Sequence, residues 1–132
     1  MDKKKCIIDR YTTTYGFNLY VIVNPDKTVI DKQFCWADDN TSIINDEYSS
    51  YVAYEISGAV NKASNKQCII VIVNKIEEDK ADCINTISHE SFHATMDIMN
   101  SCHVKYGDDS CEAFAYLQGY ITECVYRTIE KV

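Results

Sequence analysis

The pattern of apolar and polar positions divides the chain into an N-terminal half of expected strands and a C-terminal half of two expected helices. Residues 67–74 contain Cys-Ile-Ile-Val-Ile-Val, a continuous apolar run typical of a central strand buried on both faces. Residues 17–23 and residues 28–34 each predict a strand. The sequence Asn24-Pro25-Asp26-Lys27 between them has turn chemistry, so these two strands are expected to form a hairpin.

The remaining N-terminal segments have weaker patterns. Residues 6–15 are rich in β-branched and aromatic types, which fits either a strand or an extended arm. Residues 36–46 are polar and predict a loop. Residues 50–57 favour a strand, with a short helix across residues 46–62 as the competing interpretation. Residues 58–66 are expected to connect that strand to the central one.

The first long helix is expected at about residues 80–101. Asp79 is a plausible N-cap, and Asp82 places a carboxylate in the first turn, where it suits the helix dipole. One mostly apolar stripe follows a helical period: Ile84, Ile87, Ser91, Ala94, Ile98 and Cys102. The opposite face carries Thr86, His89, Glu90, His93 and Asp97. A helix buried on one side would therefore present His89, Glu90 and His93 to a cleft.

A loop at about residues 102–108 and a second helix at about residues 109–130 complete the chain. Its expected packing face consists of Phe114, Leu117, Ile121, Cys124, Val125 and Thr128. The other face consists of Glu112, Ala115, Tyr116, Gly119 and Glu123, where the small Ala115 and Gly119 would let the two helices approach closely. The prediction is one α+β domain over residues 1–132, with a small twisted, mostly antiparallel sheet packed on two C-terminal helices.

Composition narrows the possible functions. The chain has 132 residues, of which 46% are hydrophobic, and this excludes a disordered chain. A net charge of −7 argues against binding to nucleic acid or to an anionic membrane surface. We expect a cytoplasmic protein, because we find no signal-peptide pattern and no membrane-spanning run. The seven cysteines form no C-x-x-C pair and are expected to be reduced; in an exported protein, Cys102 and Cys111 are the candidate disulfide pair.

The strongest chemical signal is the sequence His89-Glu90-Ser91-Phe92-His93, which reads H-E-x-x-H. On a helix the two histidines lie one turn apart on the same face, where they can share one Zn²⁺ ion. The glutamate between them can reach a water molecule at the same ion. A catalytic zinc usually has three protein ligands, so a third ligand is expected elsewhere in the chain.

Downstream, eighteen residues separate His93 from Glu112, which lies in the run Glu112-Ala113-Phe114-Ala115. With the H-E-x-x-H motif and this spacing to a glutamate, residues 84–120 resemble the gluzincin zinc metallopeptidases. Because the chain is short, it is most similar to their minimal, single-domain members. The resemblance implies a zincin-like core and a single zinc ion. It implies that His89, His93 and Glu112 are the ligands and that Glu90 is the general base.

The sequence departs from that family at two positions. Cys111 stands where the large enzymes have Asn. Tyr116 stands where thermolysin-like members have the Asp that supports the ligand histidines, so Asp97 or backbone carbonyls are the candidates for that role here. Tyr116 is a tentative catalytic residue, since its hydroxyl could donate to an oxyanion, although it could equally be a packed aromatic.

Simpler interpretations apply to the same residues. His89 and His93 could be surface histidines of an ordinary helix, and Asp109 with Glu112 nearly forms a capping box. His103 fits a solvated loop residue or a partner of the helix C-terminus, and tentatively a substrate-binding group. Tyr54 and its strand could form an edge to which an extended peptide adds, or simply pack in the core.

The sequence therefore predicts zinc-dependent hydrolysis of peptide bonds, with a peptide or protein as the substrate. Two alternatives remain: a binding protein that keeps the zincin fold without useful turnover, or a structural component, for instance of a phage or mobile-element assembly, that the metal stabilises. The sequence does not determine the oligomeric state, and a monomer is the simplest expectation.

Overall fold

The computed structural model describes residues 4–132 and has an α+β fold. The elements in chain order are β1 Ile7–Thr12, β2 Asn18–Val23, α1 Lys27–Asp31, β3 Phe34–Trp36, a 3-10 turn Asp46–Tyr48, β4 Ala53–Asn61, β5 Lys66–Val73, α2 Lys80–Ser101 and α3 Cys111–Ile129. The five strands form one mixed sheet in the order β1-β2-β5-β4-β3. Three strand pairs are antiparallel and one, β2 with β5, is parallel.

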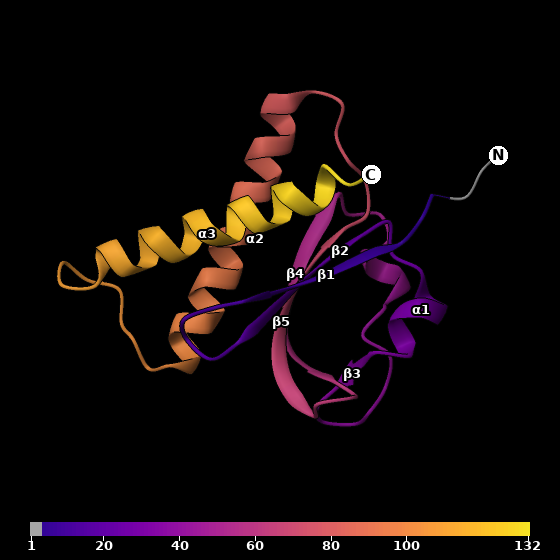
Figure 1. The fold of residues 1–132 in the computed structure, drawn as a ribbon, viewed down its shortest axis with the longest axis horizontal. Coiled ribbons are helices and arrows are strands. Elements are labelled where there is room, and N and C mark those ends of the chain that lie inside the picture. Colours follow the sequence, from indigo (N-terminus) through magenta and orange to yellow (C-terminus); the bar gives the residue numbers. More distant parts are fainter. Residues whose placement is uncertain (1–3) are drawn as a thin grey trace.

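The sheet lies between two hydrophobic cores. Alternate side chains of β2 point to opposite faces, so that Val21 packs toward α2 and α3 while Ile22 packs with Ile30 of α1. Figure 1 shows the two long helices on one side of the sheet and α1 on the other. The prediction of a sheet packed on two C-terminal helices is therefore confirmed, and a second, smaller layer covers the opposite face.

The strand predicted from the run of apolar residues is β5, and it occupies the centre of the sheet. The residues from Cys68 to Val73 are all buried. A central strand has neighbours on both edges and cores on both faces, so nearly every side chain in it must be apolar. This explains why the run lacks the alternation that an exposed face would produce.

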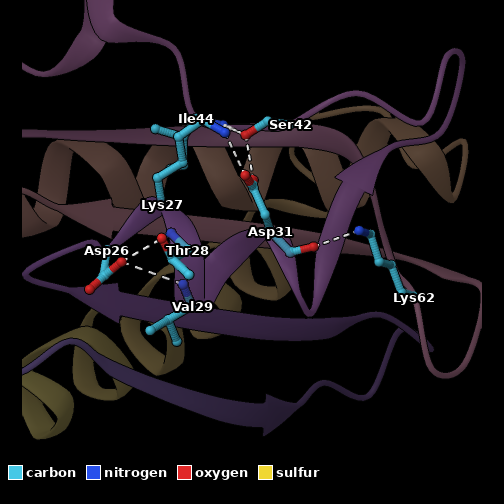
Figure 2. Close-up of polar contacts among 8 residues, drawn as sticks. All are labelled: Asp26, Lys27, Thr28, Val29, Asp31, Ser42, Ile44 and Lys62. Atoms are coloured by element: carbon cyan, nitrogen blue, oxygen red, sulfur yellow. Dashed lines mark hydrogen bonds and ion pairs between the residues drawn. The ribbon is translucent and has the colours of Figure 1, made fainter.

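The predicted strand at residues 28–34 and its hairpin with β2 are wrong. The side chain of Asp26 accepts hydrogen bonds from the backbone N–H groups of Thr28 and Val29 and thereby begins α1. Figure 2 shows this cap, together with the bond that Lys62 donates to the carbonyl of Asp31. The edge of β2 that a hairpin would have used is instead paired with β5, and a short strand follows only at Phe34.

The strand predicted at residues 50–57 exists as β4, but it extends further than expected. It runs through an irregularity between Ile56 and Ala59, where Gly58 has a positive φ of 86°, and it ends at Asn61. The predicted connection at residues 58–66 is therefore wrong in its first half. β3 pairs only with Ala59, Val60 and Asn61, so within the described chain no strand pairs with the outer edge of β4 before the bulge.

Helix α2 has the predicted extent, and the side chain of Asp79 caps it by accepting from the N–H of Asp82. Its buried stripe includes Ile87, Ala94 and Ile98, as expected. Ile84 is 56% exposed, so its place in that stripe is wrong. At this turn the neighbouring Cys83 faces the core instead, so the buried stripe passes beside Ile84.

Helix α3 lies across α2 (Figure 1), and Gln118 donates a hydrogen bond to the carbonyl of Ser88 where the two meet. All six residues of its predicted packing face are buried. Gly119 is exposed, and a Cβ atom built there would meet nothing within 4 Å, so its predicted role in close helix packing is wrong. Within residues 4–132, no helix combines the length and the apolar character needed to cross a membrane.

Candidate metal centre

Helix α2 brings the two motif histidines together. The Nε2 atoms of His89 and His93 lie 3.2 Å apart, and the two rings meet at 74°. Both side chains are exposed on the outer surface of the helix. Two imidazole nitrogens pointing at one another at this distance suit a shared cation. If the Nε2 atom of one ring carries a proton, they suit a shared hydrogen bond instead.

The spacing of the two nitrogens fits zinc. A tetrahedral ion with bonds of about 2.0–2.1 Å holds two ligand nitrogens about 3.3 Å apart, close to the separation in this structure. One potential ligand atom from each of His89, Glu90 and His93 lies within 4.8 Å of the other two. Within residues 4–132 this is the single group of three or more His, Cys, Asp or Glu side chains that converges in this way. Its donor set is therefore compatible with a zinc ion.

Glu90 differs from its histidine neighbours because it is buried, with 7% of its surface exposed. Burial raises the pKa of its carboxyl group, and the nearby His89 and His93 oppose that shift. Glu90 also lines a hollow of about 330 Å³ together with residues 51–53 at the start of β4. A carboxyl group with a raised pKa at the wall of a hollow is suited to exchanging protons with a molecule bound there.

A second acidic group near the site was not expected from the sequence. Glu55 projects from β4 toward α2, and burial raises its pKa to about 9. A hydrogen bond with Asp97 and the negative charges of Asp97 and Glu90 push the pKa in the same direction. Its Oε2 atom has almost no accessible surface and no hydrogen-bond partner. Asp97, proposed as a support for the histidines, therefore bonds to Glu55.

The burial of Glu55 could not be predicted from the alternation of polar and apolar residues in its strand. It alternates with Tyr54 and Ile56, whose side chains are buried in the core on the α1 side of the sheet. The alternation alone indicates that Glu55 faces the other way, and for an outer strand the usual expectation is solvent. The position of α2 over this strand turns that face into a partly buried one.

Replacement of Glu55 by Gln is expected to stabilise the metal-free protein by up to about 5 kcal/mol at pH 8 and by less than about 1 kcal/mol at pH 5. The folded pKa of about 9 lies above the ordinary 4.5, so the parent loses stability as the pH rises from about 4.5 to 9. Gln can still donate to Asp97 and has no proton to lose. Urea midpoints at both pH values measure the effect, with Glu130→Gln at an exposed position as the control. An equal change at the two pH values would contradict the assignment.

The structure does not bring Glu112 into the converging group. Glu112 is exposed in the first turn of α3, and its carboxylate is not among the ligand atoms that meet at the histidines. The capping-box alternative is wrong, because α3 begins after Ser110, whose side chain makes no capping bond. The role of Glu112 as the third metal ligand stays a prediction from the spacing of the motif.

The two tentative catalytic residues lie apart from the converging group. Tyr116 is 77% exposed and lines a separate hollow against residues 12–15. His103 follows the end of α2 with a positive φ of 59°, and its side chain is exposed. His103 is not part of the group formed by His89, Glu90 and His93. Their suggested roles with substrate remain predictions without support from this geometry.

Comparisons with protein-family models, with curated proteins and with solved structures found no match to this chain. The gluzincin resemblance therefore depends on the motif and its spacing alone. Any functional conclusion has to come from the geometry of the site itself.

Proposed function

We propose that this protein is a zinc-dependent peptidase whose metal is bound by His89 and His93 and whose general base is Glu90. The observation that carries the proposal is the pair of facing Nε2 atoms, 3.2 Å apart, with a buried carboxyl group beside them. A four-residue separation brings two histidines together on any helix, but a glutamate without a role would seldom be buried next to them. The gluzincin spacing adds Glu112 as the proposed third ligand.

The proposed chemistry assigns a task to each residue. A zinc ion held there would polarise a peptide carbonyl and make a nearby water molecule more acidic. Glu90 removes a proton from that water as its oxygen attacks the carbonyl carbon. When the C–N bond breaks, Glu90 transfers the proton to the leaving amine. His89 and His93 remain neutral throughout, because each must offer a lone pair to the metal.

The outer edge of β4 provides a place for the peptide backbone. No strand of the described chain pairs with this edge before the bulge, and residues 51–53 line the same hollow as His89 and Glu90. An extended peptide could add there as a further strand, held by backbone hydrogen bonds. The side chain of Tyr54 belongs to the core on the opposite face of the sheet, so Tyr54 does not line this hollow, and only the backbone of its strand is offered to a peptide.

A metal-binding protein without turnover is the second candidate, and the position of Glu112 favours it. With Glu112 outside the converging group, the histidines and Glu90 are the three potential ligands that meet. If Glu90 itself bound the ion, it would no longer be free to act as a base. Such a site would stabilise the fold or a partner complex, and no peptide would be cleaved.

Metal analysis of the purified protein followed by digestion of a peptide library distinguishes these candidates. We expect one zinc ion per chain and cleavage that stops when a chelator removes the metal and resumes when zinc is restored. Circular dichroism before and after chelation reports whether the fold depends on the ion. Bound zinc without cleavage would support the second candidate, and absence of metal binding would overturn both.

A further inference from the structure

Two hollows lie on either side of the histidine pair. The first lies beside β4 and is lined by His89 and Glu90. The second, which we call the α2–α3 hollow, is lined by Phe92, Thr95, Tyr106, Cys111, Phe114, Ala115 and Gln118. Successive residues of a helix are rotated by about 100°, so Glu90 and Phe92 project on opposite sides of His89. The candidate metal site thus lies between the hollow beside β4, which contains the proposed general base Glu90, and the α2–α3 hollow, which does not.

The α2–α3 hollow has the form of a pocket for one apolar side chain. Its volume is about 190 Å³, and apolar cavities of about 150 Å³ accommodate a benzene-sized group. Phe114 is 5% exposed, while Phe92 at 49% and Tyr106 at 68% leave large aromatic surfaces in solvent. The rings of Tyr106 and Phe114 pack edge to face, 5.2 Å between centroids. Covering these exposed rings would remove apolar surface from water.

This hollow lies near the histidine pair, because Phe92 forms part of its wall. Phe92 immediately precedes His93, and their rings lie 6.3 Å apart in an edge-to-face arrangement. One residue of an extended peptide spans about 3.3 Å. The distance from His93 to the Phe92 ring at the wall of the hollow therefore corresponds to about two residues, so a side chain in the hollow belongs to a residue close to the cleaved bond.

The position of Glu90 gives the direction of the peptide. Glu90 must transfer its proton to the leaving amine, so the half of the substrate that begins with this amine lies on the β4 side. The other half, which ends in the attacked carbonyl, extends past the histidines toward Phe92 and α3. The side chain that reaches the α2–α3 hollow is consequently the one attached to the attacked carbonyl.

We propose that the α2–α3 hollow binds an apolar side chain on the carbonyl side of the cleaved bond, so that the protein cuts after leucine-like or phenylalanine-like residues. This inference rests on the proposed peptidase function. It names the substrate class and the residues that select it. An apolar pocket of this kind discriminates between a large and a small side chain by about 10- to 200-fold in kcat/KM.

The test is a digest of a mixed peptide library by the zinc-loaded protein, with sequencing of the cleaved ends. We expect large apolar residues on the carbonyl side of most cuts. Ala115→Phe fills the hollow from the exposed face of α3, and it should lower the ratio of kcat/KM for Leu over Ala at that position by about tenfold or more. Phe92→Ala enlarges the hollow and should shift the preference toward Tyr and Trp.

The control is Ala81→Phe, the same substitution at an exposed position in the first turn of α2, away from both hollows. It should leave the ratio as in the parent. Apolar residues found on the amine side, cleavage without a preference, or an Ala115→Phe protein with the parent's ratio would each overturn the pocket assignment while leaving the peptidase function intact. Absence of any chelator-sensitive cleavage would overturn the peptidase function itself, and the pocket with it.

Discussion

A Glu90→Gln protein is expected to bind zinc as the parent does and to hydrolyse peptides about 10³-fold more slowly. Gln has nearly the shape of Glu, and the facing nitrogens of His89 and His93 are untouched. The amide cannot accept the proton of the attacking water, so the base-catalysed part of the rate disappears. Because Glu90 is buried, the neutral amide also avoids the desolvation of a charge, and the fold is expected to persist.

Zinc content, the urea midpoint and single-turnover cleavage rates measured on the same preparation test this expectation. Glu123→Gln makes the same chemical change on α3, where Glu123 forms an exposed ion pair with Arg127, and it should leave all three quantities as in the parent. Cleavage by Glu90→Gln at the parent's rate would show that another group is the base. Loss of zinc in this variant would instead assign Glu90 as a ligand.

The second large effect is expected from His93→Ala, which should lower zinc affinity by more than about 100-fold. Mutations of groups that merely support a ligand cost 10- to 100-fold, so removal of a ligand should cost more. His93 is exposed, so the metal-free protein should unfold at the same urea concentration as the parent. Titration with zinc against a competing chelator measures the affinity, and equal affinities would refute the site.

His103→Ala is the matched control, because His103 is the remaining histidine and lies outside the converging group. It should bind zinc as the parent does. The same titration on Glu112→Ala tests the third ligand that the motif spacing implies. A large loss would mean that α3 or the Glu112 side chain moves to complete the site when zinc binds. An unchanged affinity would leave the ion with the ligands of α2.

Much of the site was predictable because its spacing is local. The facing of His89 and His93 follows from their four-residue separation on a helix, and the start of that helix follows from Asp79. Glu55 was not predictable, because its contact with Asp97 joins residues far apart in the sequence. The same holds for Glu112, whose distance from the histidines depends on how α3 crosses α2.

The error at residues 28–34 has a related cause. Their β-branched side chains favour a strand, yet Asp26 caps a helix there and Ile30 is fully buried beneath the sheet. β2 pairs with β5, which comes much later in the chain, and not with the segment 28–34 that was expected to pair with it. These residues do have a local preference for strand structure, but the packing of the whole sheet determines which strand pairs with β2.

The sequence alone determined the elements whose cause lies within one turn or one run: the central strand β5, both long helices and the histidine pair. Only the tertiary structure decided the parallel pairing of β2 with β5, the burial of Glu55 beside Glu90 and the two hollows that flank the histidines. Helix geometry is repeated every few residues and can be read from spacing. Contacts between elements depend on which surfaces bury the most apolar area together, and that is a property of the complete fold.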